Sequence, residues 1–248
     1  LMLEADIQLV PIRKHHEMMV IFLHDLSHLG KIINMVLPFK PESFESYDDN
    51  TLKLALRFFP QFAKLLGTKG IIKTAFAFIP EFFTVLFSGM PKLILQIDFA
   101  GDDLSQLQQK ITALREKLKP LHPKVKIAIE DKEKKYWLIR RESFNLLRQK
   151  IHDKHTAPFI DDTVVNPQYL QEFLLKLNSI MAKYPSLIYT IAGHVGNGNF
   201  HIIPLMDITD KLQRDIIPLL SQEIYTLVKE YHGSITGEHN DGLVRTPY

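Results

Sequence analysis

The sequence contains no cysteine, which excludes disulfide bonds, thiolate zinc sites and cysteine-ligated iron–sulfur clusters within its 248 residues. It also lacks an excess of charge, because 30 basic residues stand against 28 acidic ones and leave a formal net charge of +2. This balance gives no electrostatic reason to expect nucleic acid as a partner. The lack of cysteine fits a reducing compartment. We expect a cytoplasmic protein, either free or in peripheral contact with the inner face of a membrane.

The sequence also lacks an uninterrupted apolar run of membrane-spanning length. The most lipophilic stretch, residues 71–90, holds five phenylalanines, but Lys73, Pro80 and Glu81 interrupt it. Two interpretations remain open for this stretch. It is either a helical hairpin buried in the core or against a partner domain, or a surface that docks on a membrane or on another subunit.

Both ends of the sequence resemble cuts in a longer chain. The first residues alternate between apolar and polar side chains from Leu3 to Leu9, which is typical of a strand. A start inside a strand suggests that residues 1–12 are the end of a preceding domain, and Tyr248 follows closely on a candidate site loop. With 46% hydrophobic residues, the remainder is long enough to bury a large core as one domain or two merged ones.

The apolar periodicity predicts a regular order of strands and helices. In the first half we expect strands at 18–23, 44–47, 93–99 and 125–129, a helix capped by Asp25 that runs to Val36, a helix at 102–118, and a helical insertion at 48–90. In the second half we expect helices at 132–152, 168–183 and 210–231, a strand at 160–165, two hairpin strands at 187–192 and 200–205, and a short strand at 234–236.

Each half thus follows the order β-α-β-β-α-β, the first from residue 13 to 130 and the second from 131 to 248. We predict an α+β protein in which two ferredoxin-like units share a mainly antiparallel sheet with helices packed on it. In such a unit the hairpin turn and the end of the last strand lie at the same edge of the sheet. With one strand between them, the gap is roughly 10 Å at about 4.8 Å per step.

Two short segments in the second half carry the candidate chemistry. Residues 193–201 read Gly-His-Val-Gly-Asn-Gly-Asn-Phe-His, a hairpin turn flanked by apolar runs, and residues 237–242 read Gly-Glu-His-Asn-Asp-Gly. The predicted topology brings His194, His201 and Glu238 to one edge. Two imidazoles and a carboxylate are a common ligand set for Zn, Mn or Fe(II) that leaves coordination positions open.

His239 follows the carboxylate directly and is free to move a proton. The opposing interpretation is that each imidazole is a solvated or hydrogen-bonded surface group and that the glycines serve an ordinary turn. The other eight histidines lack such an arrangement and are assigned to the surface or to structural roles. Trp137 is interpreted as a packing residue.

The two segments resemble a known family. GHVGNGNFH is similar to the H-x-G-D-G-N-x-H motif of the FAD-linked oxidase C-terminal domain, found in glycolate oxidase subunits, D-lactate dehydrogenases and D-2-hydroxyglutarate dehydrogenases, and GSITGEHNDGLVR resembles the family segment G-S-x-x-x-E-H-G-x-G. Weaker likenesses cover nearly the whole chain, in IQLVP, ESYDDNTL, YWLIRRES and DDTVVNP. The first of these resembles the last strand of a FAD-binding domain, so residues 1–12 are interpreted as the end of that domain.

The resemblance implies an enzyme: the substrate or cap domain of a flavin-dependent oxidoreductase that oxidises a small 2-hydroxy acid to the 2-keto acid. It implies that His194, His201 and Glu238 bind a divalent metal and that His239 is the general base. Arg140 matches the arginine that meets the substrate carboxylate, although Arg141 beside it could serve as well. It further implies FAD held mainly by an upstream domain, an electron-acceptor or iron–sulfur partner, and a fragment that is inactive alone.

The sequence departs from the family at two places. Asn197 stands where aspartate is usual, so a carboxylate that could orient a ligand histidine is absent there. Asn240-Asp241-Gly242 replaces Gly-x-Gly after the Glu-His pair. Two other classes of function stay open: a non-catalytic metal-binding or interaction module, and a metal-dependent hydrolase that uses metal-bound water with His239 as acid or base.

Overall fold

The computed structural model describes residues 4–57, 89–121, 124–129, 136–137, 139–140, 154–240 and 242–248. Most of the predicted helical insertion at 48–90, with the phenylalanine-rich stretch, and most of the predicted helix at 132–152 lie outside these residues. Within the described ranges, no helix has both the length and the apolar character that a membrane crossing requires.

The described strands form one antiparallel sheet. They are β1 (His15–Leu23), β2 (Ser43–Asp48), β3 (Leu93–Gly101), β4 (Lys124–Ile129), β5 (His155–Thr156), β6 (Thr163–Val164), β7 (Ile188–Gly193) and β8 (Asn199–Met206). Their order is β4-β1-β3-β2-β7-β8-β5, and β6 pairs with β8 beside this path. The α-helices are α1 (Leu29–Val36), α2 (Asp49–Arg57), α5 (Leu104–Leu118), α7 (Leu170–Met181), α8 (Lys211–Glu230) and α9 (Gly242–Arg245).

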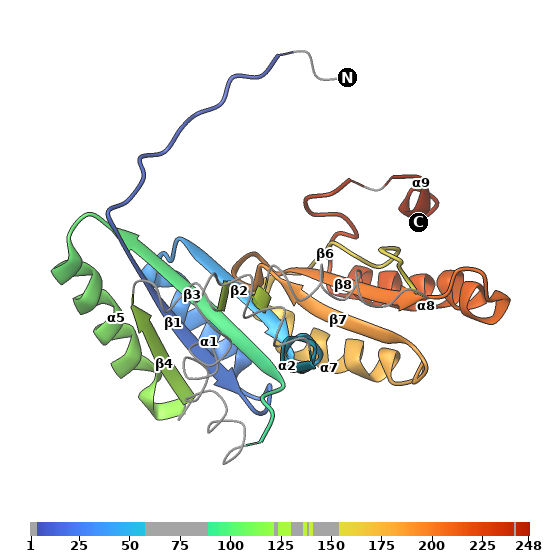
Figure 1. Ribbon diagram of the computed structural model, residues 1–248, viewed down its shortest axis with the longest axis horizontal. Helices are drawn as coiled ribbons and strands as arrows, with labels where there is room; N and C mark the ends of the chain where they lie inside the picture. Colours follow the sequence, from blue (N-terminus) through green and yellow to red (C-terminus); the bar gives the residue numbers. More distant parts are fainter. Residues whose placement is uncertain are drawn as a thin grey trace.

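Short 3-10 turns extend or link these elements. They are η1 (Leu37–Phe39), η2 (Lys119–Leu121), η4 (Pro167–Tyr169) and η5 (Val195–Asn197). Helices α1, α5, α7 and α8 cover one face of the sheet, while the N-terminal segment extends away from it (Figure 1). Their apolar sides form a single core with the sheet residues that face them.

The predicted fold class is confirmed. In the first half the strand order β4-β1-β3-β2 is that of a ferredoxin-like unit. The second half repeats it in shortened form, since β7 pairs with β8, β8 with β6, and Val164 of β6 with Ser234 by a single bridge. The two halves join where β2 pairs with β7, through Ser46 opposite Gly193 and Tyr47 opposite Ala192.

Strand β1, which lies between β4 and β3, is buried on both faces along its unbroken apolar run, as that run predicts. Side chains alternate between the faces of a sheet, so Met19 and Ile21 pack against the helices while Met18 and Val20 join a second cluster on the opposite face. All four residues are fully buried. The second cluster includes Tyr136 and is contacted by the partly buried Trp137, which confirms the packing role of that tryptophan.

Four local predictions are wrong. Residues 4–12 form no strand and lie exposed, since no other strand of the described chain pairs with their backbone. The helix expected from Asp25 begins at Leu29, because the Asp25 carboxylate accepts a hydrogen bond from the Ser27 backbone and closes a turn instead. The strand expected at 160–165 shrinks to Thr163–Val164, because Asp162 has a φ of 67°, which no strand residue adopts. The strand expected at 234–236 likewise reduces to the bridge at Ser234.

Asp48 ties the two halves together at the end of β2. One carboxylate oxygen accepts hydrogen bonds from the Thr51 backbone and hydroxyl at 2.9 and 2.8 Å, and the other accepts from the Ile191 backbone of β7 at 3.0 Å. Burial raises the pKa of this carboxyl to about 7, even though these hydrogen bonds favour the charged form. The junction between the halves therefore contains a carboxyl that resists ionisation.

We expect Asp48 to make stability depend on pH. The Asp48 carboxyl of the folded chain keeps its proton up to about pH 7, whereas the same carboxyl in the unfolded chain, with the ordinary pKa of 3.8, loses it at a much lower pH. The unfolded state then binds fewer protons, so the free energy of unfolding falls as pH rises through this interval, by about 4 kcal/mol in all. Chemical denaturation from about pH 4 to about pH 8 should show that Asp48→Asn removes this slope. The control Asp49→Asn, at the neighbouring partly exposed carboxylate, should keep it, and an unchanged slope in Asp48→Asn would refute the assignment.

Candidate functional site

The hairpin turn between β7 and β8 sets two imidazoles side by side. His194 follows the last residue of β7, and His201 lies on β8 opposite Ala192. The turn closes through the hydrogen bond from the Asn197 backbone to the His194 carbonyl and through Gly198, whose φ is 72°. A Cβ at Gly198 would lie 1.8 Å from the Val165 carbonyl oxygen, so only glycine fits there. The two rings stand edge to face with centroids 5.4 Å apart.

A buried carboxylate holds the second segment against this hairpin. Asp162 is fully buried and accepts hydrogen bonds from the backbone N–H groups of Gly237, Glu238 and His239 at 2.8 to 3.1 Å. The Asn199 amide donates to the same carboxylate at 2.9 Å. Burial alone would raise the pKa of Asp162, but these hydrogen bonds outweigh it and hold the pKa well below its usual range.

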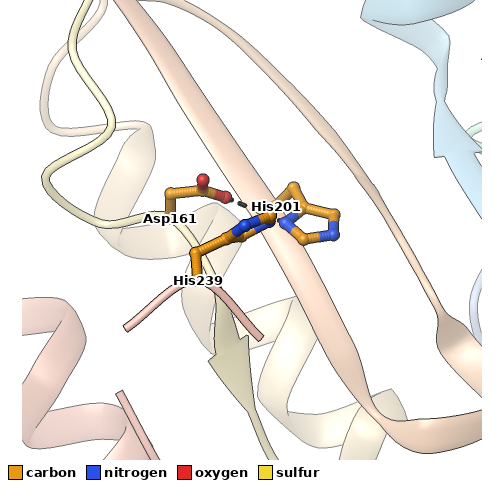
Figure 2. A group of neighbouring side chains, drawn as sticks. All are labelled: Asp161, His201 and His239. Atoms are coloured by element: carbon orange, nitrogen blue, oxygen red, sulfur yellow. Dashed lines mark hydrogen bonds and ion pairs between the residues drawn. The ribbon is translucent and has the colours of Figure 1, made fainter. Parts of the chain in front are cut away.

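The loop so held completes two groups of possible ligand atoms. His194, His201 and Glu238 each offer one such atom within 4.8 Å of the others, and so do Asp161, His201 and His239. Figure 2 shows the Asp161 and His239 side chains pointing toward His201 from two different segments. The ring centroids of His201 and His239 lie 5.2 Å apart. The structure thus brings together all four of these predicted site residues, with His201 common to both groups.

Two carboxylates that the sequence analysis did not single out hold the histidines. Nδ1 of His194 lies 2.7 Å from Oε1 of Glu45, and Nδ1 of His201 lies 3.0 Å from Oδ1 of Asp161. If each Nδ1 carries the proton and donates it, each Nε2 keeps its lone pair for a ligand. Both acids fall in segments with family likeness, ESYDDNTL and DDTVVNP, but no spacing along the chain relates them to the histidines.

His194 lies between two carboxylates. Its Nε2 faces Oε1 of Glu238 at 3.2 Å, while its Nδ1 faces Glu45. The hydrogen bond with Glu45 raises the pKa of His194, against the opposing effect of burial. With Nδ1–H donated to Glu45, the Nε2 lone pair and the Glu238 oxygen repel each other unless a proton or a cation lies between them. Ligand atoms around a tetrahedral Zn²⁺ are about 3.4 Å apart, so the spacing and the donor set fit a divalent cation.

Arg140 reaches the same site from the opposite side of Glu45. Its Nε lies 2.9 Å from Oε2 of Glu45, and its side chain is 18% exposed. Its neighbour Arg141 lies outside the described residues. Asn197 is exposed in the turn, and the carboxylates that hold the histidines are those of Glu45 and Asp161.

Comparison with known proteins covers nearly the whole chain. A profile of the family described as FAD linked oxidases, C-terminal domain, matches residues 12–248. D-2-hydroxyglutarate dehydrogenase of Pseudomonas putida is 25% identical over 245 residues, which are 97% of this chain and 23% of that protein. Glycolate oxidase subunit GlcD of Bacillus subtilis is 34% identical over 89 residues, or 36% of this chain and 19% of that protein. The chain therefore spans less than a quarter of either relative.

Solved structures share the fold. The 4-ethylphenol oxidase from Gulosibacter chungangensis aligns with a TM-score of 0.61 and 13% identity, over 92% of this chain and 46% of that one. An alkyldihydroxyacetonephosphate synthase aligns with a TM-score of 0.59 and 15% identity, over 90% and 40% of the two chains. At such low identity these likenesses support the architecture alone.

We expect Asp162→Asn to release the loop that carries Glu238 and His239. The amide would present a donor to backbone N–H groups that need an acceptor, and hydrogen bonds to a charged group contribute roughly 1.5–3 kcal/mol each. The free energy of unfolding should fall by about 3 kcal/mol, and amide hydrogen exchange at residues 237–239 should accelerate at least tenfold. Asp161→Asn is the matched control, since Asp161 accepts no hydrogen bond from those amides. Unchanged exchange in Asp162→Asn would rule out the clamp.

Proposed function

This chain belongs to the family of FAD-linked oxidase C-terminal domains, and on that premise we propose that it is the substrate-binding part of a flavin-dependent enzyme that oxidises a 2-hydroxy acid to the 2-keto acid. The names of its relatives, D-2-hydroxyglutarate dehydrogenase and glycolate oxidase subunit, support this class of substrate. The observation that carries the proposal is the position of His194 between two carboxylates, with His201 and Glu238 close enough to share one cation.

In this proposal His194, His201 and Glu238 hold a divalent cation, Zn, Mn or Fe(II), as the mixed nitrogen and oxygen donor set favours. Such a cation supplies Lewis acidity that lowers the pKa of a coordinated hydroxyl group. FAD, held mainly by another part of the protein, supplies the acceptor for the hydride. The roles of the chain's own residues follow from their places in the site.

Arg140 binds the carboxylate of the substrate. A guanidinium carries five N–H donors in a planar fork, which suits a carboxylate better than a single ammonium group. Its ion pair with Glu45, in which Nε lies 2.9 Å from Oε2, holds the guanidinium at the edge of the site. The substrate is thereby oriented with its hydroxyl group toward the histidines.

His239 takes the proton of the hydroxyl group. Imidazole is suited to this step because its ordinary pKa lies near neutral pH. His239 is exposed, and the centroid of its ring lies 5.2 Å from that of His201. Its backbone N–H donates a hydrogen bond to the Asp162 carboxylate at 2.8 Å. His239 therefore stands beside the proposed cation ligands without belonging to their group of three.

Two substitutions separate the ligands from the base. We expect His201→Ala to lower the metal content at least tenfold, because it removes one of three ligands, and to abolish turnover. His239→Ala should keep the metal and lower turnover by about a hundredfold or more, the usual contribution of a general base. Metal analysis of the purified protein and bleaching of its flavin by D-lactate, glycolate and D-2-hydroxyglutarate measure the two effects.

His155→Ala is the control, since His155 is an exposed histidine on β5 outside both ligand groups. It should match the unaltered protein in metal and turnover. Full metal content in His201→Ala would end the ligand assignment, and full turnover in His239→Ala would end its role as base.

A further inference from the structure

Glu45 is one carboxylate with two partners of different chemistry. It is the third residue of β2, its side chain is only 7% exposed, and its two oxygens point to different segments of the chain. Oε1 lies 2.7 Å from Nδ1 of His194, and Oε2 lies 2.9 Å from Nε of Arg140. Burying a carboxylate costs free energy unless its charge is compensated. Arg140 and His194 provide that compensation for Glu45.

Each contact orients a side chain that can bind a ligand. With Nδ1–H donated to Glu45, His194 presents the lone pair of Nε2 to the side where Glu238 lies at 3.2 Å. Nε of Arg140 pairs with Oε2 of Glu45 as an ion pair at 2.9 Å without hydrogen-bond geometry, and the same planar guanidinium carries four N–H donors on its terminal nitrogens. A carboxyl group is planar and rigid, and therefore the two oxygens of Glu45 fix the separation between a nitrogen ligand and an anion-binding fork.

We propose that Glu45 is a positioning residue that sets both the cation subsite at His194 and the carboxylate subsite at Arg140. The matching ligand class is a 2-hydroxy or 2-oxo acid. Its carboxylate can bind the guanidinium, and the adjoining oxygen can bind the cation held on the other side of Glu45. This inference rests on the proposed function and adds to it the residue that positions the cation subsite and the carboxylate subsite relative to each other.

Asp161 provides a matched comparison within the same site. It holds Nδ1 of the other histidine, His201, at 3.0 Å and its side chain is 14% exposed, but its ion pairs are with histidine alone among the described residues. Removing the charge of Asp161 should therefore disturb the cation subsite only. Removing the charge of Glu45 should disturb both subsites.

The test compares Glu45→Gln, Asp161→Asn and Arg140→Lys in the protein as the cell produces it, with flavin bound. Affinity for Mn²⁺ is measured by calorimetry after removal of metal with a chelator, and affinity for D-2-hydroxyglutarate at saturating Mn²⁺. Partners that orient metal ligands typically contribute 10- to 100-fold in metal affinity, so Glu45→Gln and Asp161→Asn should both weaken Mn²⁺ binding about tenfold or more.

The carboxylate measurement separates the three variants. Glu45→Gln should weaken D-2-hydroxyglutarate binding at least fivefold, Asp161→Asn should leave it within about twofold, and Arg140→Lys should weaken it while keeping Mn²⁺ affinity. A general loss of structure would weaken both ligands in every variant and would overturn the assignment. Melting temperatures measured for each variant identify that case.

Other outcomes bear on different claims. If the unaltered protein binds both ligands and Glu45→Gln weakens Mn²⁺ alone, Glu45 serves His194 only and the inference fails while the proposed function stands. If the unaltered protein binds no divalent cation, the proposed metal site fails and the inference fails with it.

Discussion

The candidate site depends on the Asp162 carboxylate, which is buried and accepts hydrogen bonds from three successive backbone N–H groups at Gly237, Glu238 and His239. A loop of this kind has no strand or helix to fix it, and isolated loop backbone is among the least stable parts of a protein. The carboxylate replaces the missing secondary structure. Its hydrogen bonds also explain why a charged group is retained at full burial, since an uncompensated one would be neutralised or expelled.

A close approach of backbone makes this arrangement possible. A Cβ at Gly237 would lie 2.3 Å from the Asn199 amide and 3.1 Å from the Asp162 carboxylate, so a larger residue would push the loop away from the hairpin. Asp162 itself adopts a left-handed conformation with a φ of 67°, directly before the first residue of β6. Asp162 therefore both shortens strand β6 and holds the loop of the candidate site. Regular strand pairing is lost at the position that holds the site together.

The charges of the site are arranged in alternation. Glu45 lies between Arg140 and His194, His194 lies between Glu45 and Glu238, and Asp161 lies against His201. Each buried acid therefore has a donor as its partner, which limits the cost of removing charge from water. The motif that residues 194–201 resemble has aspartate at the position of Asn197; in this chain, acids from β2 and from the segment before β6 contact the histidines.

The sequence by itself determined most helices and strands and the candidate metal ligands, because local patterns of residues indicate both. Apolar alternation and helical periodicity fixed β1, β3, α5, α7 and α8, and the two glycine-rich segments supplied His194, His201, Glu238 and His239 together with their residue types. Only the tertiary structure decided which groups hold those residues. Glu45, Asp161 and Asp162 contact residues 37 to 149 positions away, and no periodicity connects positions that meet through strand pairing. The lengths of β6 and of the strand expected near Ser234 were decided in the same way, since a strand exists only where a partner accepts its hydrogen bonds.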